Sequence, residues 1–175
     1  MKHVLICGDR KYTDYRRIEG AVRKEKAELG KVFVGGASGA DKLGENACRF
    51  LRVPYEVTEA KWRQEGLGAG PLRNQRQLMK LLRFEGIKEV WAFHEDFERS
   101  VGTKDMVTRA VQAGIPVRLY GKGEGWTKWP DRDNIVLCRY CGGEKLLPQM
   151  LAYKIRCQAD FHVTSDKSDE SSDTF

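Results

Sequence analysis

The chain has 175 residues, of which 41% are hydrophobic and 32% charged, and its formal net charge is +6. This composition is typical of a soluble globular protein with one full hydrophobic core and a short additional segment. No apolar run approaches the roughly 20 residues that span a bilayer, and the apolar start at residues 4–7 is too short for a signal peptide. We therefore expect a cytoplasmic protein that does not associate with membranes.

The positive charge is unevenly distributed. Residues 165–175 include four acidic residues and one basic residue, so the rest of the chain carries a net charge of +9. A basic body favours anionic partners such as nucleotides or nucleic acid. Solubility alone would explain the same charge, and the charge does not separate these interpretations.

Apolar strand-like segments alternate with amphipathic helical segments over the first 120 residues. Residues 4–7 predict a buried strand, and apolar residues at helical spacing from Asp14 predict a helix that ends at Gly30. The elements expected next are strand 32–34, a helix over 43–51, strand 55–57, helix 72–85, strand 89–93, a helix from 103 to a C-cap at Gly114, and strand 117–120. This alternation predicts a doubly wound α/β fold whose mainly parallel sheet has about five or more strands.

The composition changes after the last expected strand. Residues 1–121 are expected to form the α/β domain, and the glycine-rich residues 122–134 a linker. Residues 135–163 predict a small cysteine-containing appendage, and the Ser/Asp-rich residues 164–175 a disordered acidic tail.

A glycine-rich segment joins the second expected strand to the helix after it. Its residues are Gly35, Gly36, Ala37, Ser38, Gly39 and, one residue further on, Asp41. Glycines let a backbone approach a ligand closely, and the free N–H groups at a helix start favour an anion. Ser38 and Asp41 also have a spacing like that of a capping box, so the alternative is a tight, capped turn. The segment is neither a Rossmann glycine motif nor a Walker loop.

Two further segments open expected helices on the same sheet edge, where parallel sheets bind ligands. They contain Gly70, Pro71, Arg73 and Asn74 in one case, and Gly102, Thr103 and Asp105 in the other. Proline fits a first helical turn, and Arg73 begins a basic stripe with Arg76, Lys80 and Arg83 that could equally be a solvated face. Thr103 could cap its helix or bind phosphate. Asp105 could bind a ribose hydroxyl or only complement the helix dipole.

With Gly8, Asp9 and Arg10 after the first strand, these segments resemble the YspA-type branch of the SLOG superfamily in order and spacing over residues 2–120. The resemblance implies a Rossmann-like fold that binds a nucleotide or nucleotide-derived ligand, as a sensor, sequestering or processing protein. It places the ligand against Gly8, Asp9, Arg10, Gly35, Gly36, Ala37, Ser38, Gly39, Asp41, Gly70, Pro71, Arg73, Asn74, Gly102 and Thr103. Relatives of this type often self-associate, so it also implies a homo-oligomer.

More distant SLOG relatives supply two alternatives. Lonely-guy phosphoribohydrolases hydrolyse nucleotides, and DprA-type proteins bind single-stranded nucleic acid. The lonely-guy motif Gly-Gly-x-Gly-Thr-x-x-Glu ends in a catalytic glutamate, but here Met106 stands at that place and Asp105 one position earlier. Asp105 is the candidate catalytic acid, and whether the chain is an enzyme stays open. No redox cofactor is expected.

The five cysteines form two groups. Cys7 and Cys48 fall in apolar patterns and are expected in the core. Near the C-terminus, Cys138 and Cys141 have the two-residue gap of a zinc knuckle, and Cys157 and His162 would complete a structural Cys₃His site. Such a short appendage would need a staple. Reduced free thiols or a redox pair are the alternatives.

Overall fold

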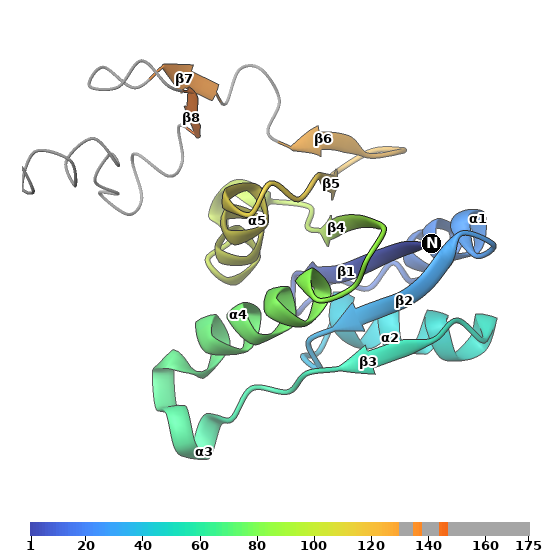
Figure 1. Cartoon of the computed structure of the whole chain (residues 1–175), viewed down its shortest axis with the longest axis horizontal. Coiled ribbons are helices and arrows are strands. Elements are labelled where there is room, and N and C mark those ends of the chain that lie inside the picture. The colour runs from blue at the N-terminus through green and yellow to red at the C-terminus, as the bar shows by residue number, and fades with distance from the viewer. Residues whose placement is uncertain (130–134, 138–143, 147–175) are drawn as a thin grey trace, which may run out of the picture. The chain divides into compact units, whose positions relative to one another are not determined.

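The computed structural model describes residues 1–129, 135–137 and 144–146 (Figure 1). The chain divides into two units, Met1–Trp129 and Pro130–Phe175. The first unit contains a six-stranded sheet, and the second contains an antiparallel pair of short strands. No helix in the described part of the chain is long and apolar enough to cross a membrane.

The sheet of the first unit has the strand order β3-β2-β1-β4-β5-β6. Its strands are β1 (Lys2–Gly8), β2 (Leu29–Val34), β3 (Tyr55–Val57), β4 (Ile87–Phe93), β5 (Val117–Tyr120) and β6 (Thr127–Trp129). The first five strands are parallel, and β6 pairs antiparallel with β5. The predicted doubly wound α/β fold is thus confirmed, and its order reverses between β1 and β4, the place where such sheets bind ligands.

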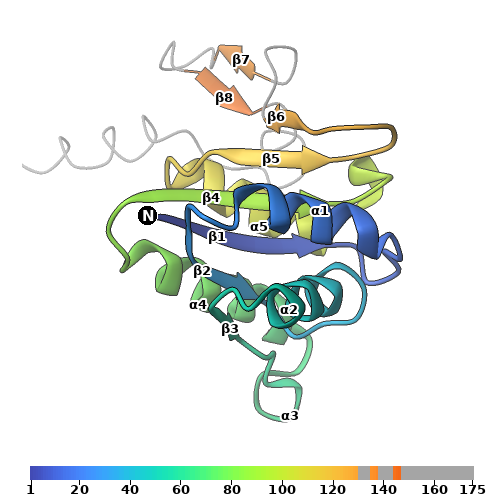
Figure 2. The ribbon, with the colours of Figure 1, turned by 90° about the vertical axis from the view of Figure 1, so that its right-hand side faces the viewer.

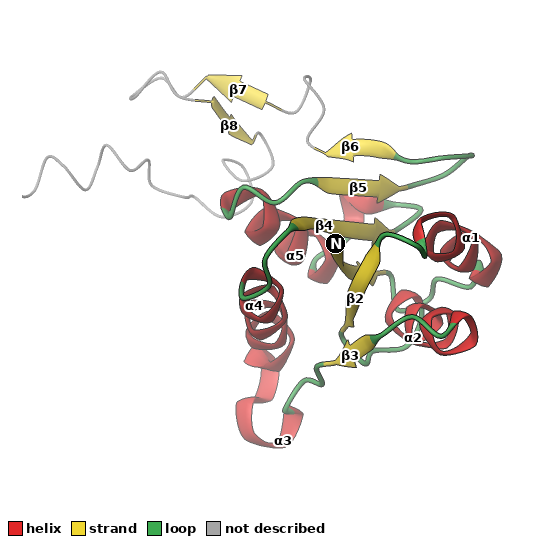
Figure 3. Ribbon diagram, turned by 45° about the vertical axis from the view of Figure 1, so that its right-hand side comes forward, coloured by secondary structure: helices red, strands yellow, loops and turns green. Residues whose placement is uncertain are grey.

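Helices cover both faces of the sheet. Figure 3 shows α1 (Tyr15–Glu25) and α2 (Ala40–Leu51) on one side and α4 (Ala69–Leu82) and α5 (Gly102–Gln112) on the other. Figure 2 shows the first pair lying in front of the sheet. Each face has its own apolar cluster, one including Ile6, Ile18 and Trp91 and the other including Phe33 and Leu81.

The boundaries of several elements differ from the prediction. Helix α1 begins after an Asp14 cap, as expected, but it ends at Glu25. Gly30 does not stop this helix, because it lies within β2 at a register shift, where Leu29 pairs with Lys2 and Lys31 with His3. An isolated glycine in a strand commonly marks such a bulge.

The segment between β3 and β4 is more helical than predicted. It forms α3 (Trp62–Glu65), a 3₁₀ turn at Gly66–Gly68 and then α4, which begins at Ala69 rather than at residue 72. Pro71 is the third residue of α4, and a proline is tolerated there because first-turn N–H groups have no partner within the helix.

The segment after β5 contains one more strand of the sheet. Strand β6 lies inside the predicted linker 122–134, so the sheet extends further than expected.

In the second unit, β7 (Ile135–Leu137) pairs with β8 (Glu144–Leu146). The predicted zinc ligands Cys138, Cys141, Cys157 and His162, and the acidic tail, lie outside the described residues.

Candidate functional site

The loop after β1 packs directly against the start of α2. The amide of Asp9 donates to the Phe93 carbonyl at 3.0 Å, and the amide of Ala40 donates to the Asp9 carbonyl at 3.0 Å. A Cβ on Gly8 would lie 2.1 Å from the Phe93 carbonyl oxygen, and one on Gly39 would lie 2.1 Å from that of Asp9. These two glycines are therefore required by the packing of the chain on itself.

A buried ion pair fixes the glycine-rich loop after β2. Asp41, 4% exposed, accepts from Arg73 Nη1 at 3.0 Å and from the Ala37 amide at 3.3 Å. The same Arg73 nitrogen donates to the Gly35 carbonyl at 2.6 Å. Burial raises the pKa of the Asp41 carboxyl, and Arg73 and the loop amides oppose that rise. Asp41 therefore anchors Arg73 to the loop.

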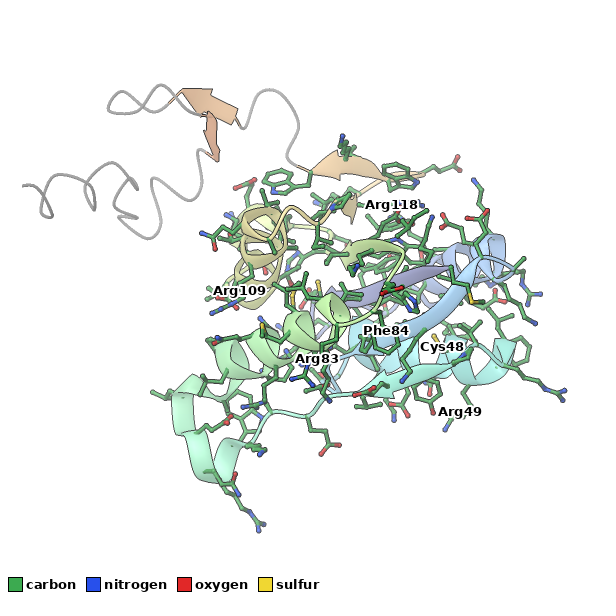
Figure 4. All side chains as sticks on the ribbon, viewed as in Figure 1. Cys48, Arg49, Arg83, Phe84, Arg109 and Arg118 are labelled. Atoms are coloured by element: carbon green, nitrogen blue, oxygen red, sulfur yellow. The ribbon has the colours of Figure 1, made fainter. Side chains whose placement is uncertain are left out.

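The network continues from Arg73 to α5. Arg73 Nε donates to Asn74 Oδ1 at 3.0 Å, and Asn74 Nδ2 donates to Asp105 Oδ2 at 2.9 Å and to the Gly102 carbonyl at 3.2 Å. Asp105 Oδ2 also accepts from Arg109 Nε at 2.9 Å. Arg109 lies on the part of α5 near α4 (Figure 4). The start of α4 is thus tied to the start of α5.

A small pocket of about 220 Å³ opens above the loop after β2. It is lined by Arg10, Gly35, Gly36, Ala37, Ser38, Ala60, Trp62 and Arg73. Helix α2 begins just after this loop, with Gly39 as N-cap and no side-chain cap. The Ala40 amide is already bonded to the Asp9 carbonyl, so the first-turn amides that suit an anion are those of Asp41 and Lys42. The Arg10 guanidinium lies 5.5 Å from the centre of the Trp62 ring.

A larger groove of about 930 Å³ runs beside this pocket, between the segment after β3 and α4. Its lining residues are Val57, Thr58, Glu59, Ala60, Lys61, Trp62, Arg63, Gln64, Arg76 and Lys80. Two of its cations are already paired: Arg76 with Glu65, and Lys80 with Glu56 at 2.8 Å. The basic stripe of α4 is therefore largely matched by acids.

The structure thus brings some of the predicted ligand residues to one pocket and leaves others behind it. The pocket lining includes Arg10, Gly35, Gly36, Ala37, Ser38 and Arg73. The other predicted ligand residues and the candidate acid are not on its lining: Gly8, Asp9, Gly39, Asp41, Gly70, Pro71, Asn74, Gly102, Thr103 and Asp105.

Two predicted caps differ in the structure. The capping box of Ser38 and Asp41 is not formed, because the N-cap of α2 is Gly39 and Asp41 bonds the loop amide of Ala37. Thr103 does not cap α5 either. It is 5% exposed, and its own amide donates to Ser100 Oγ at 3.0 Å.

Sequence reasoning missed Trp62, which lines both pockets and is 49% exposed. The available signal was its position between Lys61 and Arg63 in a glycine-rich segment, because sites that stack bases combine an aromatic ring with basic side chains.

The described residues contain no cluster of three or more His, Cys, Asp or Glu side chains that could hold a metal ion. Cys7 and Cys48 are buried, as predicted. Burial raises the pKa of both thiols, to about 12 for Cys48, so neither suits nucleophilic chemistry.

No family model matches the chain. It is 35% identical over 129 residues to the gene 61 protein of Mycobacterium phage D29, a match that covers 69% of this chain and 98% of that protein. It is also similar to the solved structure of DNA processing protein A (DprA) from Streptococcus pneumoniae, with a TM-score of 0.51 and 17% identity over 68% of this chain. The match spans 50% of that DprA chain. This likeness shows the fold, a Rossmann-like α/β domain.

Proposed function

The chain belongs to the family of the gene 61 protein of Mycobacterium phage D29, and we propose that it binds a nucleotide or nucleotide-derived ligand whose phosphate enters the small pocket. The observation that carries this proposal is the pocket lining. It combines a glycine-rich loop at a helix N-terminus, the guanidinium groups of Arg10 and Arg73, and the exposed ring of Trp62. Backbone N–H groups and arginine suit a phosphate, and an aromatic ring suits a base.

The size of the pocket limits how much of the ligand it takes. Sites for drug-sized ligands enclose roughly 300–1,000 Å³, and the small pocket encloses about 220 Å³. It suits the phosphate and the sugar next to it, so the base would extend along Trp62. Arg10 is the cation with the most freedom to bind, because Arg73 is held by Asp41 and Gly35.

Calorimetric titration with AMP and with adenosine tests the proposal. AMP should bind, and adenosine should bind at least tenfold more weakly. The Arg10→Ala variant should weaken AMP binding about tenfold to a hundredfold, as for a lost hydrogen bond to a charged group worth about 1.5–3 kcal/mol. Arg49→Ala is the matched control, since Arg49 is exposed near the other end of α2 (Figure 4). Equal affinity for AMP and adenosine, or equal losses in the two variants, would refute a phosphate site.

Single-stranded nucleic acid is a second candidate ligand. The exposed Trp62 between two basic residues on an open groove favours it, and the structural neighbour DprA is named as a DNA processing protein. Binding of an oligonucleotide that weakens steeply with rising salt, while AMP does not bind, would favour this candidate over the first.

Hydrolysis of the ligand has less support. Asp105 is not on the pocket lining, and its carboxylate already bonds Asn74 and Arg109. We therefore propose that Asp105 positions Asn74 and that the protein binds its ligand without turnover. Release of base or phosphate from a nucleotide panel, abolished in Asp105→Asn with little change in affinity, would instead support an enzyme.

A further inference from the structure

The small pocket and the larger groove meet at Trp62. Both are lined by Ala60 and Trp62, whereas Arg10 lines only the small pocket. The Arg10 guanidinium lies over the indole ring, 5.5 Å from its centre. Within the described residues, no other cation and no aromatic ring stacks on Trp62. The exposed ring of Trp62 therefore joins the two pockets.

The groove beyond Trp62 is basic. Its lining contains four cationic side chains, Lys61, Arg63, Arg76 and Lys80, and a single carboxylate, Glu59. Arg76 and Lys80 are held in place by carboxylates behind them, but Lys61 and Arg63 are exposed and form no ion pair with any described residue.

The two kinds of cation have different uses. Arg76 binds Glu65 through its two terminal nitrogens, so its Nε–H and outward N–H donors remain in a fixed orientation. Lys61 and Arg63 form no ion pair with a described residue, and Glu59 is the one carboxylate beside them on the groove lining. A groove with both oriented donors and free charge suits an anion better than an apolar group.

We propose that this groove is a second anion subsite, and that the ligand is a nucleotide derivative with two phosphate groups on either side of a nucleoside, such as a phosphorylated dinucleotide. The inference rests on the proposed function, since it takes the first phosphate to occupy the small pocket. One phosphate lies against the loop after β2, the base of the nucleoside between the phosphates stacks on Trp62, and the second phosphate binds Lys61 and Arg63.

Titration with AMP and with the 5′-phosphorylated dinucleotide pApA tests the second subsite. The wild-type protein should bind pApA at least tenfold more tightly than AMP. The Lys61→Ala/Arg63→Ala double variant should lose about tenfold more affinity for pApA than for AMP. The control is Lys24→Ala/Arg49→Ala, which removes two exposed positive charges from α1 and α2 and should not reduce this difference.

The outcomes separate the two proposals. If AMP binds and pApA binds no more tightly, or if both double variants lose equal pApA affinity, the second subsite is wrong and the nucleotide site stands. If a folded protein binds neither AMP nor pApA, the proposed function fails and this inference with it. Affinity that keeps rising with each nucleotide up to an eight-residue strand would overturn a two-phosphate ligand in favour of a polynucleotide.

Discussion

Several residues of the site hold the protein together as well as facing the pocket. Arg73 is the clearest case, because it lines the pocket while bonding the buried Asp41 and the Gly35 carbonyl. A Cβ on Gly35 would lie 1.9 Å from Arg73 Nη1. The glycine at this position therefore makes room for the arginine that holds the loop.

Replacing Arg73 should consequently destabilise the fold. Arg73→Ala leaves the Asp41 carboxylate buried without its cation, a change that costs about 3–5 kcal/mol in buried pairs. Urea unfolding measures the loss. Arg76→Ala is the control, because its pair with Glu65 is more exposed and should cost about 1 kcal/mol or less.

The same ion pair makes the loss depend on pH. Burial raises the pKa of Asp41 in the folded state, so the folded Arg73→Ala variant holds its proton more tightly than the unfolded chain does. Its stability should then rise relative to wild type as the pH falls from 7 toward the ordinary value of 3.8. Adding Asp41→Asn should recover part of the loss at pH 7. If the loss of stability in Arg73→Ala does not change with pH and is not reduced by Asp41→Asn, the unpaired Asp41 carboxylate is not its cause.

Two glycines give a contrasting pair of substitutions. Gly8→Ala places its Cβ against the Phe93 carbonyl and should lower the free energy of unfolding by about 1–3 kcal/mol, as overpacking does. Gly20→Ala meets open space within α1 and should raise it by about 0.5–1 kcal/mol. Denaturant midpoints test both, and a Gly8→Ala variant as stable as wild type would show that the contact at the end of β1 relaxes without cost.

At the scale of elements, periodicity predicted the order of strands and helices well. Five strand-like segments separated by amphipathic helices admit few arrangements other than a doubly wound sheet. The ends of helices and strands were harder to predict where a residue type such as glycine occurs in two different structural settings. Gly30 was interpreted as a helix stop but forms a bulge in β2. Pro71 lies in the first turn of α4, as expected, but the helix begins at Ala69 rather than at residue 72.

The site was predictable in its position more than in its contacts. Glycine-rich segments after strands pointed to the sheet edge at which the small pocket lies. The sequence could not show that Asp41 and Arg73 pair with each other, because they are 32 residues apart and meet only when β2 and α4 are assembled. Trp62 was not predicted as a site residue, because the sequence does not show that it lies where the small pocket and the groove meet.

One cluster of charges links four elements through their side chains. Lys2 of β1 bonds Glu25 of α1 at 2.5 Å, and Arg118 of β5 bonds Glu25 and, at 2.8 Å, Glu89 of β4. The four side chains are only 9–15% exposed. Burial by itself raises the pKa of Glu25, but the hydrogen bonds from Lys2 and Arg118 outweigh it and lower the pKa overall.

The lowered pKa of Glu25 sets how the stability of a variant without this carboxylate depends on pH. A carboxyl whose folded-state pKa is lowered contributes stability above its unfolded-state value, here 4.5, and loses it as the pH falls through the folded-state value. Glu25→Gln should therefore be less stable than wild type by about 2 kcal/mol at pH 7, between surface and buried pairs. Thermal unfolding from pH 7 to pH 3 should show this difference narrowing below pH 4.5. A constant difference would assign the loss to packing.

At the scale of the whole molecule, the cysteines of the second unit are the candidate ligands of a metal ion. Strand β7 ends one residue before Cys138, and its partner β8 begins two residues after Gly142. Two paired strands on either side of a Cys-x-x-Cys segment suit a zinc knuckle. We propose that Cys138, Cys141, Cys157 and His162 hold one structural zinc ion. Elemental analysis of protein purified without added metal should give about one zinc per chain, and the Cys141→Ser variant should contain less zinc. Folded protein that contains no zinc while its cysteines are free thiols would exclude the site.

The C-terminal boundary of the first unit lies beyond the last expected strand. The sequence placed the end of the α/β domain at residue 121, but β6 adds Thr127–Trp129 to the sheet, and the Trp129 ring packs edge-on against Phe97 at 4.8 Å. The segment before β6 also contacts the domain, because the Gly125 carbonyl accepts from Arg17 at 2.6 Å and Trp126 stacks on Arg118.

A chain of residues 1–129 should therefore fold cooperatively and bind AMP as the full chain does. A chain ending at residue 121 exposes Phe97 and the edge of β5, and it should be less stable by about 3 kcal/mol or more, the cost of deleting a large buried aromatic side chain. Trp129→Ala in the 1–129 chain isolates the contribution of that ring, and Lys128→Ala on the same strand, an exposed residue, is the control. Equal unfolding free energies for the two truncated chains would place the boundary at residue 121 after all and make β6 an addition that contributes no stability.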